Sequence, residues 1–570
     1  MNLEDIKKTE TWELYEEGRN YHRRVGIYDD TDKNYRMYNG NQWDGAKLGD
    51  VEPVQKNFIR PIVRYKVSVV HDNLFAIIFA SQNYESQAFR SQAERYCSIL
   101  NGYAAKVWEK QKMDTKGRKL TKDSAINDEG IMYVDFDTEK MMPVCEIVKK
   151  NDIYYGDEND DDIQNQPYIL IRKRLPVKNA IEFAIERGMS EDKADFIIGD
   201  NDTFEESGDA AKEEKDDKVT IIYKLYKQKG TVHFSIATRY VDICKDVNLG
   251  IALYPVAHFN WEEKEGSARG EGEVRYLIPT QIEVNRIEMR RILTVKQQAY
   301  PMKVIDESRV TNPSMLNQAG AIIKVNGSTP VEDVNKIVGV IHPAQMSTDV
   351  KQLQDDLINM TRELANASDV ATGSVNPEQA SGRAILAVQQ ASQAPMTEQK
   401  ESYKAFLEDV ASIWLEYLIV HSVDGIPMED KVTDAMGNET IQMVVVPQAM
   451  LKKLQASVKI EVTPKSVYDR FAQEQTLENL LVQGLLHPNR LTEFEAYVNA
   501  LDDDAVAPKA KLMEIVKNAK NKQAQIAQME AEAQAMMQRV ERFLLEDPET
   551  QASEIAQSQM NPMAQGAMAR

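Results

Sequence analysis

The chain is poor in cysteine and in long apolar runs, and its acidic residues outnumber its basic ones. The cysteines are few, scattered and odd in number (Cys97, Cys145 and Cys244), which argues against a disulfide framework or a zinc site and favours a reducing compartment. No stretch of about 18 apolar residues occurs, so we expect no helix that spans a membrane. The acidic first residues lack the apolar segment of a secretory signal, so we expect no export.

The motifs of common enzyme classes are also missing. The sequence has no GxxxxGK[ST] phosphate loop, no GxSxG nucleophile elbow and no HExxH zinc helix. Its seven histidines are dispersed, so we expect each to be a packing or surface residue rather than a catalytic base. The glycine-rich residues 269–273 lack the third glycine of a dinucleotide-binding fingerprint, and we expect them to form a hinge. We therefore expect no enzymatic activity, no catalytic or metal site and no cofactor.

Size and charge set the next limits. At 570 residues the chain is too long for one ordinary core, so several domains or one large elongated subunit are expected. Hydrophobic residues at 42% and charged residues at 28% indicate a folded protein. The net charge of −21 would repel DNA on average, because proteins that hold phosphates usually carry a basic balance. The protein therefore either never meets nucleic acid, or meets it on a surface where a weak grip is useful.

Residues 1–130 are predicted to be mainly helical, with helices over residues 9–25 and 91–111. Between these, a helix is expected to end at Gly40 and to be followed by a loop with an exposed Trp43.

The next helix is predicted to begin at Pro61, with Ile62 on its apolar face and Arg60 and Arg64 beside that face. The two arginines are expected either to reach carboxylates of a neighbouring subunit or to lie in solvent as ordinary charged residues of an amphipathic helix.

Residues 131–272 are predicted to be rich in strands. Alternation of β-branched and aromatic residues predicts strands over residues 130–136, 144–148, 168–174, 219–227, 231–237 and 257–261. The acidic residues 157–162 loosely resemble a calcium loop but lack its central glycine and closing glutamate, so a solvated turn is the preferred interpretation. Residues 201–218 have the composition of a mobile surface loop.

Residues 273–300 predict a long helix, whose regular part is expected to begin at Pro279 and which Pro301 ends. The helix carries four basic residues on its other faces: Arg286, Arg290, Arg291 and Lys296. Residues 301–343 then predict a small β unit, with strands over residues 302–305, 321–325 and 337–341.

A second helix is predicted over residues 347–367, with apolar residues at alternating steps of three and four: Val350, Leu353, Leu357, Met360 and Leu364. This narrow seam is typical of a helix that packs on other helices. A turn-rich segment, residues 368–382, follows. A third helix is expected from residue 383 to about residue 421, bent at Pro395, because proline removes a backbone donor and clashes with the preceding turn.

This order of helix, small β insert, helix, polar loop and long kinked helix resembles the core of the tailed-bacteriophage portal protein (head-to-tail connector) family. Residues 35–43 are similar to its YxxYxGxQW-type segment, residues 57–65 to its NxIRPxV-type segment, and residues 254–272 to its YP…GxG approach to the first stem helix. The resemblance covers roughly residues 30–500 and rests on the order and spacing of these segments.

The resemblance implies an α+β, mainly helical, elongated portal-like subunit. It divides the chain into an N-terminal helical part of the wing (1–130), a β-rich part of the wing (131–272), a first stem helix (273–300), a clip (301–343), a second stem helix (344–367), a tunnel loop (368–382), a long kinked wing helix with a β hairpin (383–465), a helical crown or barrel (466–545) and a disordered tail (546–570).

The resemblance also implies a function and a set of partners. Twelve copies would form a ring at one capsid vertex, through which double-stranded DNA is packaged and ejected. Expected partners are the terminase large subunit, head-completion or adaptor proteins, and the major capsid and scaffolding proteins, with no membrane. The ring would be assembled in the cytoplasm of the bacterial host and become part of the virion.

Three groups of residues are expected to serve these roles. The tunnel loop would face DNA through Asp369, Thr372, Ser374, Asn376, Glu378, Gln379 and Ser381. The clip would present Asp306, Glu307, Arg309, Lys324, Glu332, Asp333 and Lys336 to the motor and adaptor. The stem arginines are expected either to pair with acids of an adjacent stem helix or to face the channel; the acids considered are Asp355, Asp356 and Glu363.

Two other functions remain as alternatives. One is another phage head–tail structural protein, such as an adaptor or scaffold, against which the β insert between two long helices argues. The other is a hydrolase or nucleotidyltransferase built on the β-rich middle section. That function would need a converging cluster of ligand residues, which the sequence does not indicate.

Overall fold

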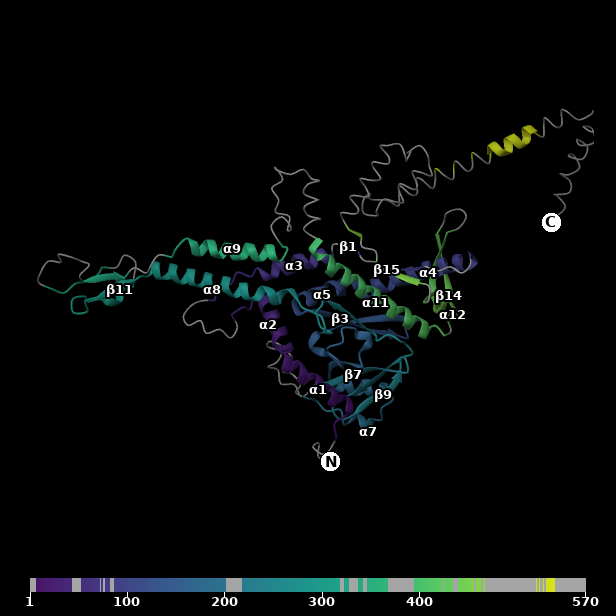
Figure 1. Cartoon of the computed structure of the whole chain (residues 1–570), viewed down its shortest axis with the longest axis horizontal. Helices are drawn as coiled ribbons and strands as arrows, with labels where there is room; N and C mark the ends of the chain where they lie inside the picture. Colours follow the sequence, from purple (N-terminus) through teal and green to yellow (C-terminus); the bar gives the residue numbers. More distant parts are fainter. Residues whose placement is uncertain are drawn as a thin grey trace, which may run out of the picture. The chain divides into compact units, whose positions relative to one another are not determined.

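The computed structural model describes residues 7–43, 53–71, 73–74, 77–81, 87–200, 218–317, 322–327, 337–341, 346–367, 394–423, 425–433, 439–455, 458–462, 465–466, 519, 522, 526 and 529–538. The chain divides into two units, one made of Met1–Val432 and Ile441–Pro464, the other of Thr433–Thr440 and Lys465–Arg570. Helices and sheets are mixed in the first unit, in line with the predicted α+β class. Figure 1 shows the elements with their labels.

The N-terminal helices are α1 (Glu10–Val25), α2 (Ile27–Asn39), α3 (Ile59–Val70), α4 (Gln87–Gln111) and α5 (Met113–Asn127). The hydroxyl of Thr9 caps α1 by accepting a hydrogen bond from the Trp12 amide. Gly40, at φ 95°, ends α2 in the left-handed conformation, as predicted. Trp43 is half-buried rather than exposed, because its indole N–H donates to the Val54 carbonyl at 2.9 Å.

Two antiparallel sheets lie beside these helices. The strand order is β10-β3-β4 in one and β5-β6-β7-β8-β9 in the other. Their bounds are β3 (Glu129–Asp137), β4 (Met142–Val148), β5 (Ile153–Tyr155), β6 (Tyr168–Pro176), β7 (Lys218–Gln228), β8 (Thr231–Ala237), β9 (Asp242–Asn248) and β10 (Val256–Asn260). The predicted strands are confirmed, and the sequence analysis missed β5 and β9. The short helices α6 (Val177–Glu186) and α7 (Glu191–Ala194) follow β6.

Helix α11 (Thr397–His421) belongs to the main apolar core. Its Tyr403 and Phe406 pack against Phe259 of β10, with ring centroids 5.6 and 6.3 Å apart. Trp414 lies further along the same helix and is 1% exposed. Each such side chain stabilises the fold by about 1.5–3 kcal/mol.

The remaining elements are β1 (Asn73–Leu74), β2 (Ile77–Ser81), β13 (Ile426–Thr433), β14 (Glu439–Val446), α12 (Gln448–Gln455), β15 (Val458–Val462) and β16 (Lys465–Ser466), of which β2 and β15 pair.

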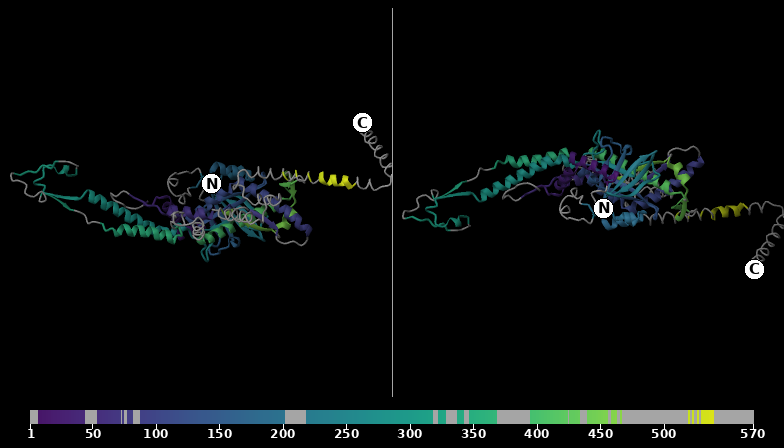
Figure 2. Two further views of the ribbon diagram at one scale, coloured as in Figure 1. Left: turned by 90° about the horizontal axis from the view of Figure 1, so that it is seen from above. Right: turned by 90° about the horizontal axis from the view of Figure 1, so that it is seen from below.

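Helices α8 (Glu273–Ala299) and α9 (Asp349–Leu364) lie side by side, and we call them the stem. The described residues between them, which we call the tip, contain the antiparallel strands β11 (Met302–Ile305) and β12 (Val338–Ile341). Figures 1 and 2 show the stem extending from the sheets, with the tip at its far end.

Two predictions for this region were wrong. Helix α8 begins at Glu273 and runs through Pro279, which lies in its interior, so the helix tolerates the missing donor instead of starting there. The described residues 322–325 form no regular strand; Val325 makes only an isolated bridge with Val310, because strand-forming residues need a partner strand along their length.

The predicted long kinked helix is described only in part. Pro395 lies in a 3-10 turn, Ala394–Met396, and α11 begins directly afterwards at Thr397. The proline thus directly precedes α11, which suits its lack of an N–H, and the bend expected at Pro395 stays a prediction. Residues 383–393 lie outside the described part, as do residues 201–217 of the predicted loop 201–218 and the predicted tail 546–570. Within the predicted crown, residues 529–538 are helical.

Two further properties concern the described residues only. None of their helices is long and apolar enough to cross a membrane. They contain no group of three or more His, Cys, Asp or Glu side chains arranged to hold a metal ion. In the acidic loop 157–162, three carboxylates each accept a hydrogen bond from the backbone amide two residues further along the chain, as in ordinary turns. They belong to Asp157, Asp160 and Asp162.

Candidate functional site

The chain enters the stem through a buried arginine. Arg269 is 7% exposed, and its guanidinium donates to the carboxylate of Glu129 at 2.5 Å and to that of Glu158 at 2.8 Å. Burial alone would raise the pKa of Glu129, but the charge of Arg269 and a hydrogen bond from His258 outweigh burial and lower it to about 2. All three side chains of this cluster are therefore held in place by charge-assisted hydrogen bonds.

The glycines after Arg269 allow close backbone approach. A Cβ on Gly270 would lie 2.6 Å from the Glu262 carbonyl oxygen, and one on Gly272 would lie 2.8 Å from the Asp128 nitrogen. The amide of Gly272 donates to the Asp128 carboxylate at 2.7 Å. The predicted hinge is thus wrong, because this segment is held in place by its neighbours. Its glycines are required because a side chain would not fit, and not because they allow the backbone to rotate freely.

The first turn of α8 is anchored by a second buried ion pair. The Glu273 carboxylate lies 2.6 Å from the ammonium of Lys66 on α3, and both side chains are less than 9% exposed. Further along α8, the Gln281 side chain accepts from the Phe58 amide at 3.0 Å and donates to the Lys56 carbonyl at 2.8 Å. The root of the stem is therefore bonded to α3 and to the segment before it.

The two stem helices meet at a polar residue. Gln354 of α9 is fully buried and donates to the Val284 carbonyl at 3.3 Å and to the Glu288 carboxylate at 2.9 Å. Its amide oxygen accepts from Arg291 at 2.6 Å. The sequence analysis missed Gln354, because a single polar residue beside an apolar seam gives no sign that it is buried.

The apolar seam of α9 lies on the flank of the helix instead of against α8. Val350 and Leu357 are half-buried, but Leu353 is 53%, Met360 62% and Leu364 75% exposed. Three acids spaced seven residues apart run beside the seam on the solvent side, and all three are exposed: Asp349, Asp356 and Glu363. One chain alone therefore leaves Leu353, Met360 and Leu364 of this seam, bordered by negative charge, in solvent.

Two arginines of α8 pair with glutamates of the same helix. Arg286 donates to Glu283 at 2.5 Å, and Arg291 to Glu288 at 3.0 Å. Within the chain these partners differ from the α9 acids that we expected. Arg290 is exposed and forms no ion pair with any described carboxylate. Lys296 is exposed near the end of α8.

The tip exposes both charged and apolar side chains. Asp306, Glu307 and Lys324 are exposed, whereas Arg309 is half-buried. The Asp306 carboxylate accepts from the Ser308 amide at 3.1 Å, which fixes the turn after β11. The most exposed apolar side chains here are Ile322 (80%), Tyr300 (77%), Met302 (67%), Val304 (56%) and Ile341 (50%). Glu332, Asp333, Lys336 and the seven predicted tunnel-loop residues lie outside the described part of the chain.

A small groove of about 350 Å³ lies at the root of the stem, between the start of α3 and the end of α9. Phe58, Pro61 and Ile358 form its apolar lining, and Lys56 and Arg362 also border it. The nearby Arg60 and Arg64 of α3 are exposed, as expected.

The described residues of the stem and the tip thus offer exposed apolar and charged surfaces for binding other molecules. The chain matches the phage P22-like portal protein family over residues 19–570, which is nearly its whole length. No curated protein matches it in sequence. The chain therefore belongs to the family of phage P22-like portal proteins, which are non-enzymatic structural components of the virion capsid.

Proposed function

We propose that the protein is a portal whose copies, twelve in number, close into a ring around a channel for double-stranded DNA. The observation that carries this proposal is the exposed seam of α9. Leu353, Met360 and Leu364 are each more than half exposed, although a regular spacing places them in one stripe. Contiguous apolar surface on a folded chain is a common mark of a protein interface. Here we infer that a neighbouring copy covers the seam.

A ring is the assembly that suits this seam. In this proposal a second copy covers the stripe with a different surface, and not with the same stripe in a two-fold pair. Such a head-to-tail contact repeats from copy to copy and closes into a ring when the rotation between copies divides a full turn.

The charge of the chain suits a channel through which DNA slides. Each copy carries −21, so the ring is strongly acidic and holds phosphates weakly. In this proposal the tunnel loop, residues 368–382, lies at the narrowest point, and the stem helices line the channel below it. Arg290, exposed and without a described partner, is available for a weak tracking contact or for a neighbour's carboxylate.

The tip is proposed to act as the clip, the docking surface for the terminase large subunit during packaging and for head-completion or adaptor proteins afterwards. Its exposed apolar residues and the charges of Asp306, Glu307 and Lys324 supply such a surface. The residues around the sheets form the wing, and residues 466–545 form the crown. The major capsid and scaffolding proteins surround the ring, which is assembled in the host cytoplasm and retained in the virion.

Negative-stain electron microscopy of the purified protein tests this proposal. We expect particles with a central hole, and class averages that give the number of subunits. A compact monomer or dimer at micromolar concentration would remove the ring. Another head–tail role, as an adaptor or scaffold, would then be the better interpretation.

A further inference from the structure

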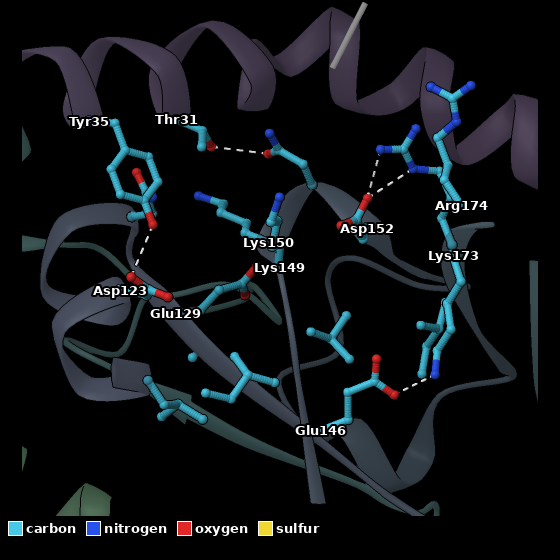
Figure 3. A pocket seen from close by; sticks show the side chains of 18 of the residues that line it. Thr31, Tyr35, Asp123, Glu129, Glu146, Lys149, Lys150, Asp152, Lys173 and Arg174 are labelled. Carbon is cyan, nitrogen blue, oxygen red and sulfur yellow. Dashed lines mark hydrogen bonds and ion pairs between the residues drawn. The ribbon is translucent and has the colours of Figure 1, made fainter. Parts of the chain in front are cut away.

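A cleft of about 820 Å³ lies between helix α2 and the neighbouring strands β4 and β6 (Figure 3). Tyr35 of α2 and Asp123 of α5 form one side, joined by a hydrogen bond of 3.0 Å. Residues 146–152 and 171–175 form much of the rest. The cleft belongs to neither the stem nor the tip, and its volume is within the usual range of binding pockets, about 300–1,000 Å³.

Both strands present an edge to the cleft. Residues 146–148 of β4 and residues 171–175 of β6 line it without a gap. Because successive side chains of a strand point to opposite faces, a cavity on one face meets every second residue. A cavity that meets each residue in turn runs along the edge, where backbone N–H and C=O groups are available for another strand.

The pairing of the strands leaves these edges open among the described residues. In the order β10-β3-β4, strand β4 is the last. Strand β6 lies between β5 and β7, but β5 pairs only with residues 169–171, whereas β7 continues to Pro176. Residues 172–175 therefore have a strand partner on one side only. At about 3.3 Å per residue, this open edge is about 13 Å long, which is enough for four residues of an added strand.

One ion pair bridges the gap between the two edges. The ammonium of Lys173 on β6 pairs with the carboxylate of Glu146 on β4, across the gap. The same ammonium lies 5.4 Å from the ring centroid of Tyr133 and 4.9 Å from that of Tyr223. This pair shows that the two strands lie within reach of one lysine and one glutamate side chain.

The charges in the cleft are mostly satisfied within the chain. Lys150 pairs with Asp128, and Arg172 with Asp152 at 2.8 Å. Lys149 is exposed and makes no ion pair with a described carboxylate. Lys149 is therefore an exposed positive charge beside two open strand edges, and Asp123, whose carboxylate feels its charge, lines the same cleft.

We propose that this cleft binds an extended acidic segment of a partner protein, which adds as a strand between β4 and β6 and places a carboxylate against Lys149. The main-chain groups of the segment pair with the two edges, and this pairing supplies the affinity. The Lys149 ammonium supplies the preference for an acidic side chain. The proposal does not depend on ring formation.

Fluorescence anisotropy with synthetic peptides tests the proposal on the full-length protein. The probe is a fluorescein-labelled pentapeptide that alternates valine and glutamate. One comparison peptide carries lysine in place of glutamate, and another is N-methylated on alternate amides, which removes donors that a strand needs. We expect saturable binding of the acidic probe alone. On binding it, the amides of Ile147, Val148 and residues 172–175 should exchange more slowly with deuterium.

Two charge-reversal variants separate a specific contact from general electrostatics. Lys149→Glu is expected to weaken binding of the acidic probe roughly three- to tenfold, because one attraction becomes a repulsion. Lys193→Glu makes the same change at an exposed residue of α7 that does not line the cleft, and it should leave binding unchanged. Both substitutions are at exposed positions, so both proteins should fold.

Several results would overturn the proposal. These are no saturable binding of the acidic probe up to about 1 mM, equal binding of the N-methylated peptide, or a preference for the lysine peptide. Equal weakening by the two variants would also count against it. Binding to the unassembled chain but not to purified rings would show that a neighbouring copy fills the cleft, and a second copy would then replace the partner segment as its occupant.

Discussion

The seam of α9 gives the sharpest test of ring assembly. Leu357 is half-buried against the core of its own chain, so replacing it with Asp would damage the subunit as well as the contact. Met360 belongs to the same seam and is 62% exposed. Replacing Met360 with Asp should therefore leave the fold of one chain intact and act on the contact between chains.

The size of the effect follows from the exposed fractions. Fully burying a leucine or methionine side chain is worth about 1.5–3 kcal/mol. Leu353, Met360 and Leu364 keep 53%, 62% and 75% of their surface exposed. Covering that surface is therefore worth roughly 1–2 kcal/mol each, or on the order of 4 kcal/mol for the seam. Met360→Asp loses the contribution of one of these side chains. It also forces a carboxylate out of water, which costs several kcal/mol more.

Together these contributions weaken each contact by at least about 3 kcal/mol, which is more than a hundredfold in the association constant. Sedimentation velocity should show mostly monomer at a concentration where the unchanged protein is a ring. The matched control is Asn359→Asp, which adds the same charge at the adjacent exposed residue, about 100° around the helix. Its ring should persist.

Thermal unfolding of the separated monomers checks the reasoning. The melting temperatures of Met360→Asp and the unchanged chain should agree, because the side chain is mostly exposed within one subunit. A full ring formed by Met360→Asp at normal affinity would refute the placement of the seam at a subunit contact. Equal loss of the ring in Asn359→Asp would show that added charge alone disrupts assembly.

Three further outcomes are expected. Shortening residues 368–382 should leave rings visible by microscopy while DNA packaging or retention changes; loss of the rings would make this segment structural. Arg290→Glu should weaken assembly, and Asp356→Lys or Glu363→Lys should restore it; normal rings with stalled packaging would instead place Arg290 on the DNA path. Burial and the charge of Arg269 lower the pKa of His22 from 6.5 to about 4, so its contribution to stability is complete above pH 6.5 and is lost as the pH falls towards 4. In His22→Phe, the melting temperature should fall less steeply as the pH is lowered from 6.5 to 4, because unfolding takes up as much as one proton fewer. An unchanged pH dependence would contradict the assignment.

The regular elements were predictable because their patterns are local. The spacing of the α9 seam and the alternation in β3, β6 and β7 each depend on residues within one element. The strand expected at residues 321–325 failed for the opposite reason: its apolar residues favour a strand, but only Val325 finds a bridge partner, Val310. Strand preference takes effect only where a partner strand is present.

The root of the stem was mispredicted because its contacts are long-range. Gly270 and Gly272 favour a hinge when only their neighbours in sequence are considered. Arg269 is bound by Glu129 and Glu158, which lie more than 100 residues away in the sequence. One chain alone does not reveal such pairs, and the burial of Gln354 was hidden for the same reason.

The clamp at Arg269 determines how movement can pass through a subunit. A flexible joint at residues 269–272 would let the stem swing while the sheets stayed still. With the guanidinium held by two carboxylates and Glu273 tied to Lys66, the first turn of α8 is fixed to the body of the subunit. The stem then acts as a lever arm. A sideways force on the tip tilts the sheets and helices around the root instead of bending the chain. Any partner that pulls on the tip therefore acts mechanically on the sheets and helices at the root of the stem.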